Sequence, residues 1–217
     1  MTGSDVEAGL LDEEPRFSLE LWDWRRQMAA IYARVRALSP EEGWRVWRED
    51  RDRLFREHPQ SPIPRERRAS FPGLALFDYD PGLRVRAEIV PTAVESDIGL
   101  LHSGGGTTRA VTFGIARFEI DGTPATLPIY RLLAYGDGVF LPFRDATSGA
   151  ETYGGGRYLI DTVKGADTLE STVDTVHLDF NFAYHPSCVH DPSWSCPLAP
   201  ADSRLPMAVR GGERMPQ

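Results

Sequence analysis

The chain has 217 residues, of which 41% are hydrophobic, and this length suits one domain with a substantial core plus an accessory element. A formal net charge of −8 without a broad basic face excludes sequence-independent nucleic-acid binding, which needs clustered positive charge. No apolar run approaches the roughly 18 residues of a membrane span, and the N-terminus has no signal-peptide pattern. We therefore expect a soluble, cytoplasmic protein with no membrane partner, in which Cys188 and Cys196 stay reduced.

The first quarter of the chain predicts a leader and two helices. Residues 1–17 carry many charges without a repeating apolar face, which predicts a disordered acidic leader. A helical segment is predicted over residues 18–58, and its first helix rests on apolar residues that recur at steps of three and four: Trp24, Met28, Ile31, Val35 and Leu38. Ser39 as a cap, Pro40 at the first helical position and Glu42 three residues after the cap predict the start of the second helix.

Two features rich in arginine follow, and each admits an alternative. Arg51 shares a face of the second helix with Trp44, Trp47 and Leu54, so it is either buried or, as is commoner, solvated with its stem over apolar surface. Residues 59–72 are rich in proline and predict a connector. The arginines of this connector indicate a solvated linker in preference to an anion-binding arm.

Residues 73–217 predict a β domain with an irregular C-terminal segment. Apolar and polar residues alternate through residues 83–90 and 111–120, and the second run slips phase near Arg117, which indicates a bulge. Further strands are predicted between turn signals: 126–135, 138–143, 156–162 and 172–184. Six or more short antiparallel strands predict a mainly β fold, an antiparallel barrel or sandwich, with the two N-terminal α-helices packed against it; we favour the barrel.

The strand predicted at 176–184 has two contrasting faces. One face is apolar and consists of Val176, Leu178, Phe180, Phe182 and Tyr184. The other carries His177, Asp179, Asn181 and Ala183. This polar face is either exposed to solvent, the usual case in an antiparallel sheet, or turned into a cavity where a few polar groups orient a ligand.

The segment FRDATSGAETYGGGRY, residues 143–158, predicts a β-hairpin with a bulge at its three glycines. Arg144 either pairs with a carboxylate across the hairpin or faces a ligand, and Arg157, if it points inward, suits a carboxylate or phosphate group. The glycine run lacks the lysine and the following helix of a phosphate-binding loop.

The cysteine-containing segment YHPSCVHDPSWSC does not predict a metal site. Cys188, His190 and Cys196, with His185, match none of the common zinc spacings. Reduced, buried thiols are favoured over a disulfide. No metal and no cofactor are predicted.

Several ordered segments together resemble a known prokaryotic family. They are WREDRDRLFREHPQSP, LPFRDATSGAETYGGGRYL, LDFNFAYHPSC and CPLAPADSRLPMAVRGGE, and they resemble the domain-of-unknown-function family 1684 from about residue 20 to about residue 214. The resemblance implies no established reaction. It implies that the following residues occupy motif positions: Arg144, Asp145, Thr147, Tyr153, Gly155, Arg157, Asp179, Asn181, Tyr184, Cys188, Cys196, Arg204 and Arg210. His185 and Ser203 depart from the family's pattern, which has asparagine at both places, and this argues against a mechanism or a zinc site through His185.

Three functional hypotheses remain. The first is a protein that binds a small anionic or polar ligand in a β-barrel cavity lined by Arg144, Asp145, Tyr153, Arg157, Asp179, Asn181, Tyr184 and Arg204. The second is an acid/base hydrolase or lyase, with Asp179 or His177 as the base and Arg144 or Arg157 stabilising an oxyanion. In the third, the polar motif is purely structural. The sequence leaves the oligomeric state open.

Overall fold

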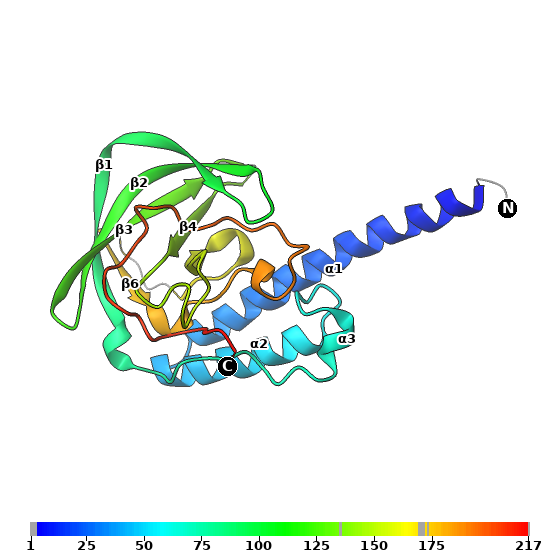
Figure 1. Ribbon diagram of the computed structural model, residues 1–217, viewed down its shortest axis with the longest axis horizontal. Helices are drawn as coiled ribbons and strands as arrows, with labels where there is room; N and C mark the ends of the chain where they lie inside the picture. The colour runs from blue at the N-terminus through cyan, green and yellow to red at the C-terminus, as the bar shows by residue number, and fades with distance from the viewer. Residues whose placement is uncertain (1–3, 135, 169–171, 173, 217) are drawn as a thin grey trace.

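The computed structural model describes residues 4–134, 136–168, 172 and 174–216, and its helices lie along one side of a strongly curved sheet (Figure 1). Helix α1 spans Ser4–Arg36, α2 spans Pro40–Glu57 and the short α3 spans Arg65–Arg68. The structure thus has a helix from Ser4 onward, where the sequence predicts a disordered leader over residues 1–17. Residues 4–14 contain two leucines and three glutamates, which favour helix even without an apolar stripe.

Helices α1 and α2 pack through the stripes that the sequence predicts. Met28, Ile31, Tyr32 and Val35 of α1 share one hydrophobic cluster with Trp44, Trp47 and Leu54 of α2. The buried indole of Trp47 donates a hydrogen bond of 3.0 Å to the hydroxyl of Tyr32. Ser39 is the N-cap of α2 as predicted, but its hydroxyl bonds the Glu42 carboxylate and not a backbone N–H, so the capping box is incomplete.

The β domain is one antiparallel sheet of six strands in the order β5-β4-β3-β2-β1-β6. The strands are β1 Arg84–Leu101, β2 Thr107–Ile120, β3 Thr123–Leu132, β4 Gly138–Phe143, β5 Arg157–Asp161 and β6 Thr175–Asp179. Register shifts occur in β1 between Pro91 and Ser96 and in β2 between Thr112 and Gly114, so the second lies nearer the start of the strand than the predicted slip at Arg117. These irregularities let the long strands bend.

The curved sheet is a half-barrel whose two edges approach each other. Tyr158 in β5 and Tyr184, just after β6, exchange two backbone hydrogen bonds of 2.8 and 3.0 Å. Buried side chains from all six strands form one core cluster, among them Leu127, Leu141 and Leu178. The predicted mainly β fold with N-terminal helices is therefore confirmed, and the interior of the half-barrel is a packed core.

The strand predicted at 176–184 ends earlier than expected. β6 stops at Asp179, and Phe180–Phe182 form a turn of 3-10 helix. Because the period of two is lost there, Asn181 and Ala183 are buried together with their apolar neighbours. The four residues predicted to form one polar face therefore do not share a face. His177 and Asp179 belong to β6, whereas Asn181 and Ala183 lie beyond its end and are buried.

Candidate functional site

Arg157, in the hairpin of residues 143–158, is a fully buried cation that holds the C-terminal segment. It is 1% exposed, and its guanidinium donates to the carbonyl oxygens of Gly211, Glu213 and Val209 at 2.5, 3.2 and 2.8 Å. Its Nη2 also lies 3.6 Å from a carboxylate oxygen of Asp145. Burial lowers the pKa of Arg157 to about 10, which leaves it charged at neutral pH. The guanidinium is saturated by protein groups, as expected of a structural arginine.

Asp145 completes this attachment. One of its oxygens accepts the backbone N–H of Val209 at 2.6 Å, and both accept from the hydroxyl of Thr147. Arg144, by contrast, does not form the ion pair considered for it: its Nε is buried and has no hydrogen-bond partner among the described residues. Arg204 is exposed and lines a surface depression beside β2 and β3 whose lining does not include Arg157.

Asp179 and Asn181 form a second network, separate from Arg157. The Asn181 side chain exchanges hydrogen bonds of 2.8 and 2.9 Å with the backbone of Asp80. One oxygen of Asp179 accepts from the backbone and the side chain of Asn181, at 3.0 and 2.8 Å. The structure thus connects the end of β6 to the segment before β1, and it does not bring Asp179 and Arg157 into one site.

Asp179 and His177 do share a small cavity of about 210 Å³ between β6 and the junction of α1 with α2. Arg84 also lines this cavity, and its Nε lies 4.0 Å from the second oxygen of Asp179. Burial raises the pKa of Asp179, an effect opposed by its hydrogen bonds with Asn181. Asp179 and His177, the two residues predicted as candidate bases, therefore line one cavity. The arginine that lines it with them is Arg84, whereas the sequence predicts Arg144 or Arg157.

A buried charge cluster joins the helices to the C-terminal segment. Arg51 is 1% exposed and forms an ion pair with Glu213, which is equally buried. The guanidinium carbon of Arg51 lies 4.7 Å from the ring centre of Trp47 and 5.1 Å from that of Tyr184. The rarer alternative for Arg51 is therefore correct. Sequence reasoning missed Glu213, although it ends the last motif segment, because its partner lies 162 residues away along the chain.

Glu213 also contacts His185, whose ring is buried. The carboxylate accepts the backbone N–H of His185 at 2.8 Å and lies 3.7 Å from its Nδ1, while Nε2 accepts the backbone N–H of Tyr153 at 3.2 Å. Burial lowers the pKa of His185 to about 4, so the ring is neutral at neutral pH. Burial raises the pKa of Glu213, but the charge of Arg51, the two histidines His185 and His190 and the backbone N–H of His185 together lower it further, so the pKa lies below its ordinary value and the carboxylate stays ionised.

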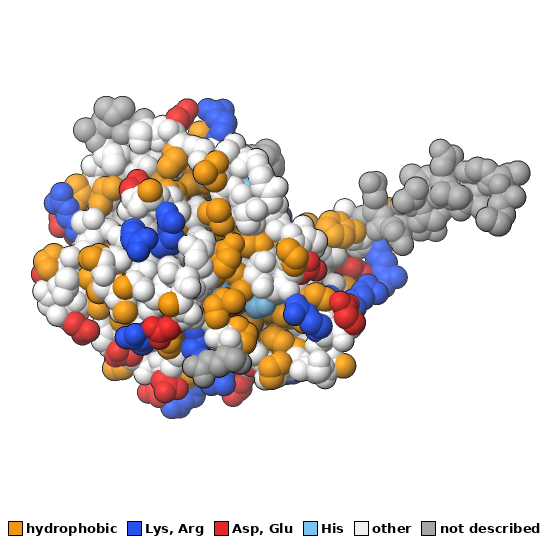
Figure 2. Space-filling view, viewed as in Figure 1, with side chains coloured by type: hydrophobic (Ala, Val, Ile, Leu, Met, Phe, Trp, Pro, Cys, Tyr) orange, Lys and Arg blue, Asp and Glu red, His pale blue; other side chains and the backbone are white. Residues whose placement is uncertain are grey.

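The cavity with the clearest capacity for a ligand borders this cluster, where three segments of chain meet. It has a volume of about 610 Å³, within the usual range for small-molecule sites. Its walls come from the connector before β1, the segment around η4 (Ser187–Val189) and the C-terminal segment. Apolar lining residues are Ile63, Phe71, Leu74, Val189 and Met215, and polar ones include Arg67, His185, His190 and Glu213. We call it the connector cavity. Figure 2 shows hydrophobic side chains gathered on this face around a patch of histidine surface, between α3 and the C-terminus.

His190 is the unusual group of the connector cavity. Its Nε2 is buried and has no hydrogen-bond partner among the described residues. The ring packs edge-on against Phe55, with centres 5.5 Å apart, and burial lowers its pKa. Arg67 donates to the backbone carbonyl of His190. A buried polar atom without a partner costs about 1–3 kcal/mol, so a ligand group that bonds Nε2 would recover free energy that the protein alone forgoes.

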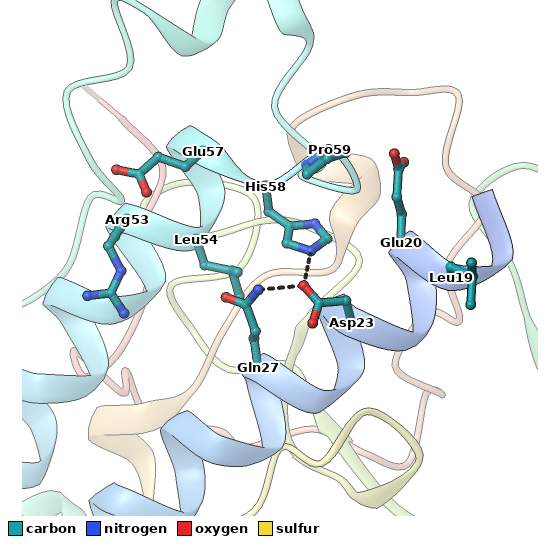
Figure 3. Close-up of a pocket in the computed structure, with 9 residues that line it drawn as sticks. All are labelled: Leu19, Glu20, Asp23, Gln27, Arg53, Leu54, Glu57, His58 and Pro59. Atoms are coloured by element: carbon teal, nitrogen blue, oxygen red, sulfur yellow. Dashed lines mark hydrogen bonds and ion pairs between the residues drawn. The ribbon is translucent and has the colours of Figure 1, made fainter. Parts of the chain in front are cut away.

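A second pocket, of about 430 Å³, lies between α1 and the C-terminal end of α2. Its polar groups already bind one another: Gln27 and His58 both reach the same oxygen of Asp23, at 2.7 and 3.3 Å (Figure 3). The other nitrogen of His58 accepts the backbone N–H of Gln60. This pocket therefore offers a ligand fewer unsatisfied groups than the connector cavity.

The fold is a mainly antiparallel β half-barrel with N-terminal helices, and the connector cavity is its candidate ligand site. The chain belongs to the family described as "Protein of unknown function (DUF1684)", which matches residues 69–214. It is also similar to an uncharacterised protein of Haloarcula marismortui solved by NMR in solution, at 38% identity and a TM-score of 0.58, over 79% of this chain and 91% of that one. A search of curated proteins finds no match. No helix among the described residues is long and apolar enough to cross a membrane.

Proposed function

We propose that the protein binds a small molecule with an apolar body and an anionic or hydrogen-bonding group, and that the connector cavity is the binding site. The supporting observation is the buried, unpartnered Nε2 of His190 in a cavity of about 610 Å³ with largely apolar walls. The proposed site is thus formed by the connector and the C-terminal segment, and not by a cavity between the strands, whose inward side chains form the core.

The charges near the cavity favour an anionic group. Arg67 and Arg214 both line the cavity, and the hydrogen bonds found for them reach only backbone carbonyls, His190 O for Arg67 and Leu76 O for Arg214. Glu213 is the carboxylate in the lining, and the buried Arg51 neutralises it. A carboxylate or sulfonate would therefore meet the positive charge of these two arginines, of which Arg67 is partly offset by Asp191, while its apolar body contacts Phe71 and its neighbours.

The test is a fluorescence titration with 1-anilinonaphthalene-8-sulfonate, an apolar aromatic body that carries one anionic group. Ser70 lines the cavity and is exposed, so Ser70→Trp adds bulk at the mouth without entering the core. Thr123→Trp, at the exposed start of β3, is the matched control.

We expect saturable binding of one probe per chain, at least tenfold weaker in Ser70→Trp than in Thr123→Trp. His190→Leu should also weaken binding about tenfold, the equivalent of one hydrogen bond, and should not lower stability, because it removes an unsatisfied buried atom. Equal affinities for the two tryptophan variants, or no saturable binding, would refute the proposal.

The small cavity at Asp179 favours a second candidate function, acid/base catalysis on a small substrate. Asp179, whose pKa is raised by burial, and His177 line one cavity with Arg84. This arrangement would put a general base beside a cation that can stabilise a developing negative charge. If the protein turns over ester or phosphoester test substrates, Asp179→Asn should abolish the activity and leave probe binding in the connector cavity unchanged. Activity that survives Asp179→Asn would eliminate this candidate.

A further inference from the structure

The two cysteines lie beside each other although eight positions separate them in sequence. Cys188 belongs to η4 and is half-buried, whereas Cys196 is buried, and both thiols are free. Each thiol lies close enough to the other to shift its pKa. The segment of Cys196 is held by Ser103, whose backbone N–H donates to the Cys196 carbonyl at 2.9 Å and whose hydroxyl accepts the Cys196 N–H at 3.1 Å.

The surroundings of the two sulfur atoms differ in a way that assigns them different roles. The Cys188 sulfur lies 3.9 Å from the hydroxyl of Tyr153. Hydrogen bonds from Cys196, Ser103 and Tyr153 lower the pKa of Cys188 to about 6, whereas the interaction with Cys188, together with burial, raises the pKa of Cys196. A thiolate is the nucleophilic form of cysteine, so the more accessible sulfur is also the more reactive one.

We propose that Cys188 and Cys196 form a peroxide-reactive dithiol, in which Cys188 is the attacking thiol and Cys196 the resolving thiol. The Cys188 thiolate attacks one oxygen of hydrogen peroxide, the O–O bond breaks, and hydroxide leaves as Cys188 becomes a sulfenic acid. The Cys196 sulfur then attacks the Cys188 sulfur, an S–S bond forms, and the sulfenic oxygen leaves as water. Overall, two thiols and one peroxide give one disulfide and two waters.

The structure supports this order of events over the reverse. Cys196 is 4% exposed, so peroxide reaches Cys188 first, and Cys196 is already adjacent when the sulfenic acid forms. Tyr153 and Ser103 both offer hydroxyl groups that stabilise negative charge on the Cys188 sulfur. Redox-sensing cysteines share this pattern of an accessible thiolate beside a resolving cysteine. The proposal is independent of any ligand in the connector cavity.

The experiment treats the reduced full-length protein with hydrogen peroxide, quenches it with an alkylating agent under denaturing conditions and measures intact mass. Wild type should lose both free thiols together and form one intramolecular disulfide that dithiothreitol reverses. Cys196→Ala should accumulate the sulfenic acid at Cys188, trapped by dimedone, whereas Cys188→Ala should leave Cys196 unmodified under the same conditions. Tyr153→Phe should slow the oxidation severalfold and leave its products unchanged.

Two results would overturn the proposal. One is wild-type protein that keeps both thiols, or forms only sulfinic acid, at peroxide concentrations that oxidise a free cysteine peptide. The other is dimedone labelling of Cys196 in Cys188→Ala at the rate seen for Cys188 in Cys196→Ala. The wild-type measurement needs no variant, so the first result stands even if an alanine substitution impairs folding.

Discussion

The buried ion pair between Arg51 and Glu213 should be among the strongest single determinants of stability in this protein. Each side chain is about 1% exposed, so Arg51→Met leaves the Glu213 carboxylate without a cation in a region that excludes water. Removing one partner of a buried pair costs about 3–5 kcal/mol. That loss is a large fraction of the roughly 5–15 kcal/mol that stabilises a typical domain.

The Arg51 prediction is tested by a double-mutant cycle in urea, followed by tryptophan fluorescence, because Trp47 contacts the Arg51 guanidinium. Arg51→Met and Glu213→Gln should each lose about 3–5 kcal/mol, and the double variant should lose clearly less than their sum, since it leaves no unpaired charge. Arg45→Met, which removes an exposed pair with Glu41 on α2, should lose less than about 1 kcal/mol.

The prediction is wrong if Arg51→Met is no more destabilising than Arg45→Met, or if the losses of unfolding free energy in Arg51→Met and Glu213→Gln simply add in the double variant. Additivity would mean that Arg51 and Glu213 stabilise the fold independently, Arg51 through its aromatic contacts and Glu213 through His185. A double variant more stable than wild type would instead fit the view that buried pairs contribute little net stability.

Two further predictions concern a buried histidine and a close backbone approach. The pKa of His185 is about 4 in the folded protein, against an ordinary 6.5, so as the pH falls the unfolded chain takes up the proton before the folded protein does. The neutral ring therefore contributes its full stability above pH 6.5, and the free energy of unfolding falls by about 3 kcal/mol towards pH 4. Urea unfolding at several pH values should show the full decline in wild type and in His102→Gln, and a decline about 3 kcal/mol smaller in His185→Asn, where the other buried groups such as His190 still titrate; an equal decline in all three proteins would contradict the prediction. Gly212 has a φ of +73° and a Cβ there would lie 2.2 Å from the Ala183 carbonyl oxygen, whereas Gly122, at +72°, has open space. Gly122→Ala should cost about 1–2 kcal/mol and Gly212→Ala about 1–3 kcal/mol more in thermal unfolding, so equal losses would disprove the steric argument.

The candidate site was only partly predictable, and particular residues show why. The sequence left open whether Arg157 points inward. The structure buries it, and its hydrogen-bond partners are backbone carbonyls of the last segment, which leave no trace in side-chain patterns. Asp179 and Asn181 looked like a polar strand face because the alternation continues beyond the point where β6 ends. His190 gave no sequence signal, since what distinguishes it is the missing partner of a single buried atom.

The sequence by itself determined those helices and strands that depend on the spacing of neighbouring residues. The stripe of α1, the cap of α2 and the strand of residues 138–143 follow from residue spacing, because helices and strands repeat over a few residues. Only the tertiary structure decided which charges are buried and where a cavity remains. Arg51 meets Glu213 across 162 residues, and the connector cavity is bounded by segments from three parts of the chain, so both depend on contacts that no local pattern encodes.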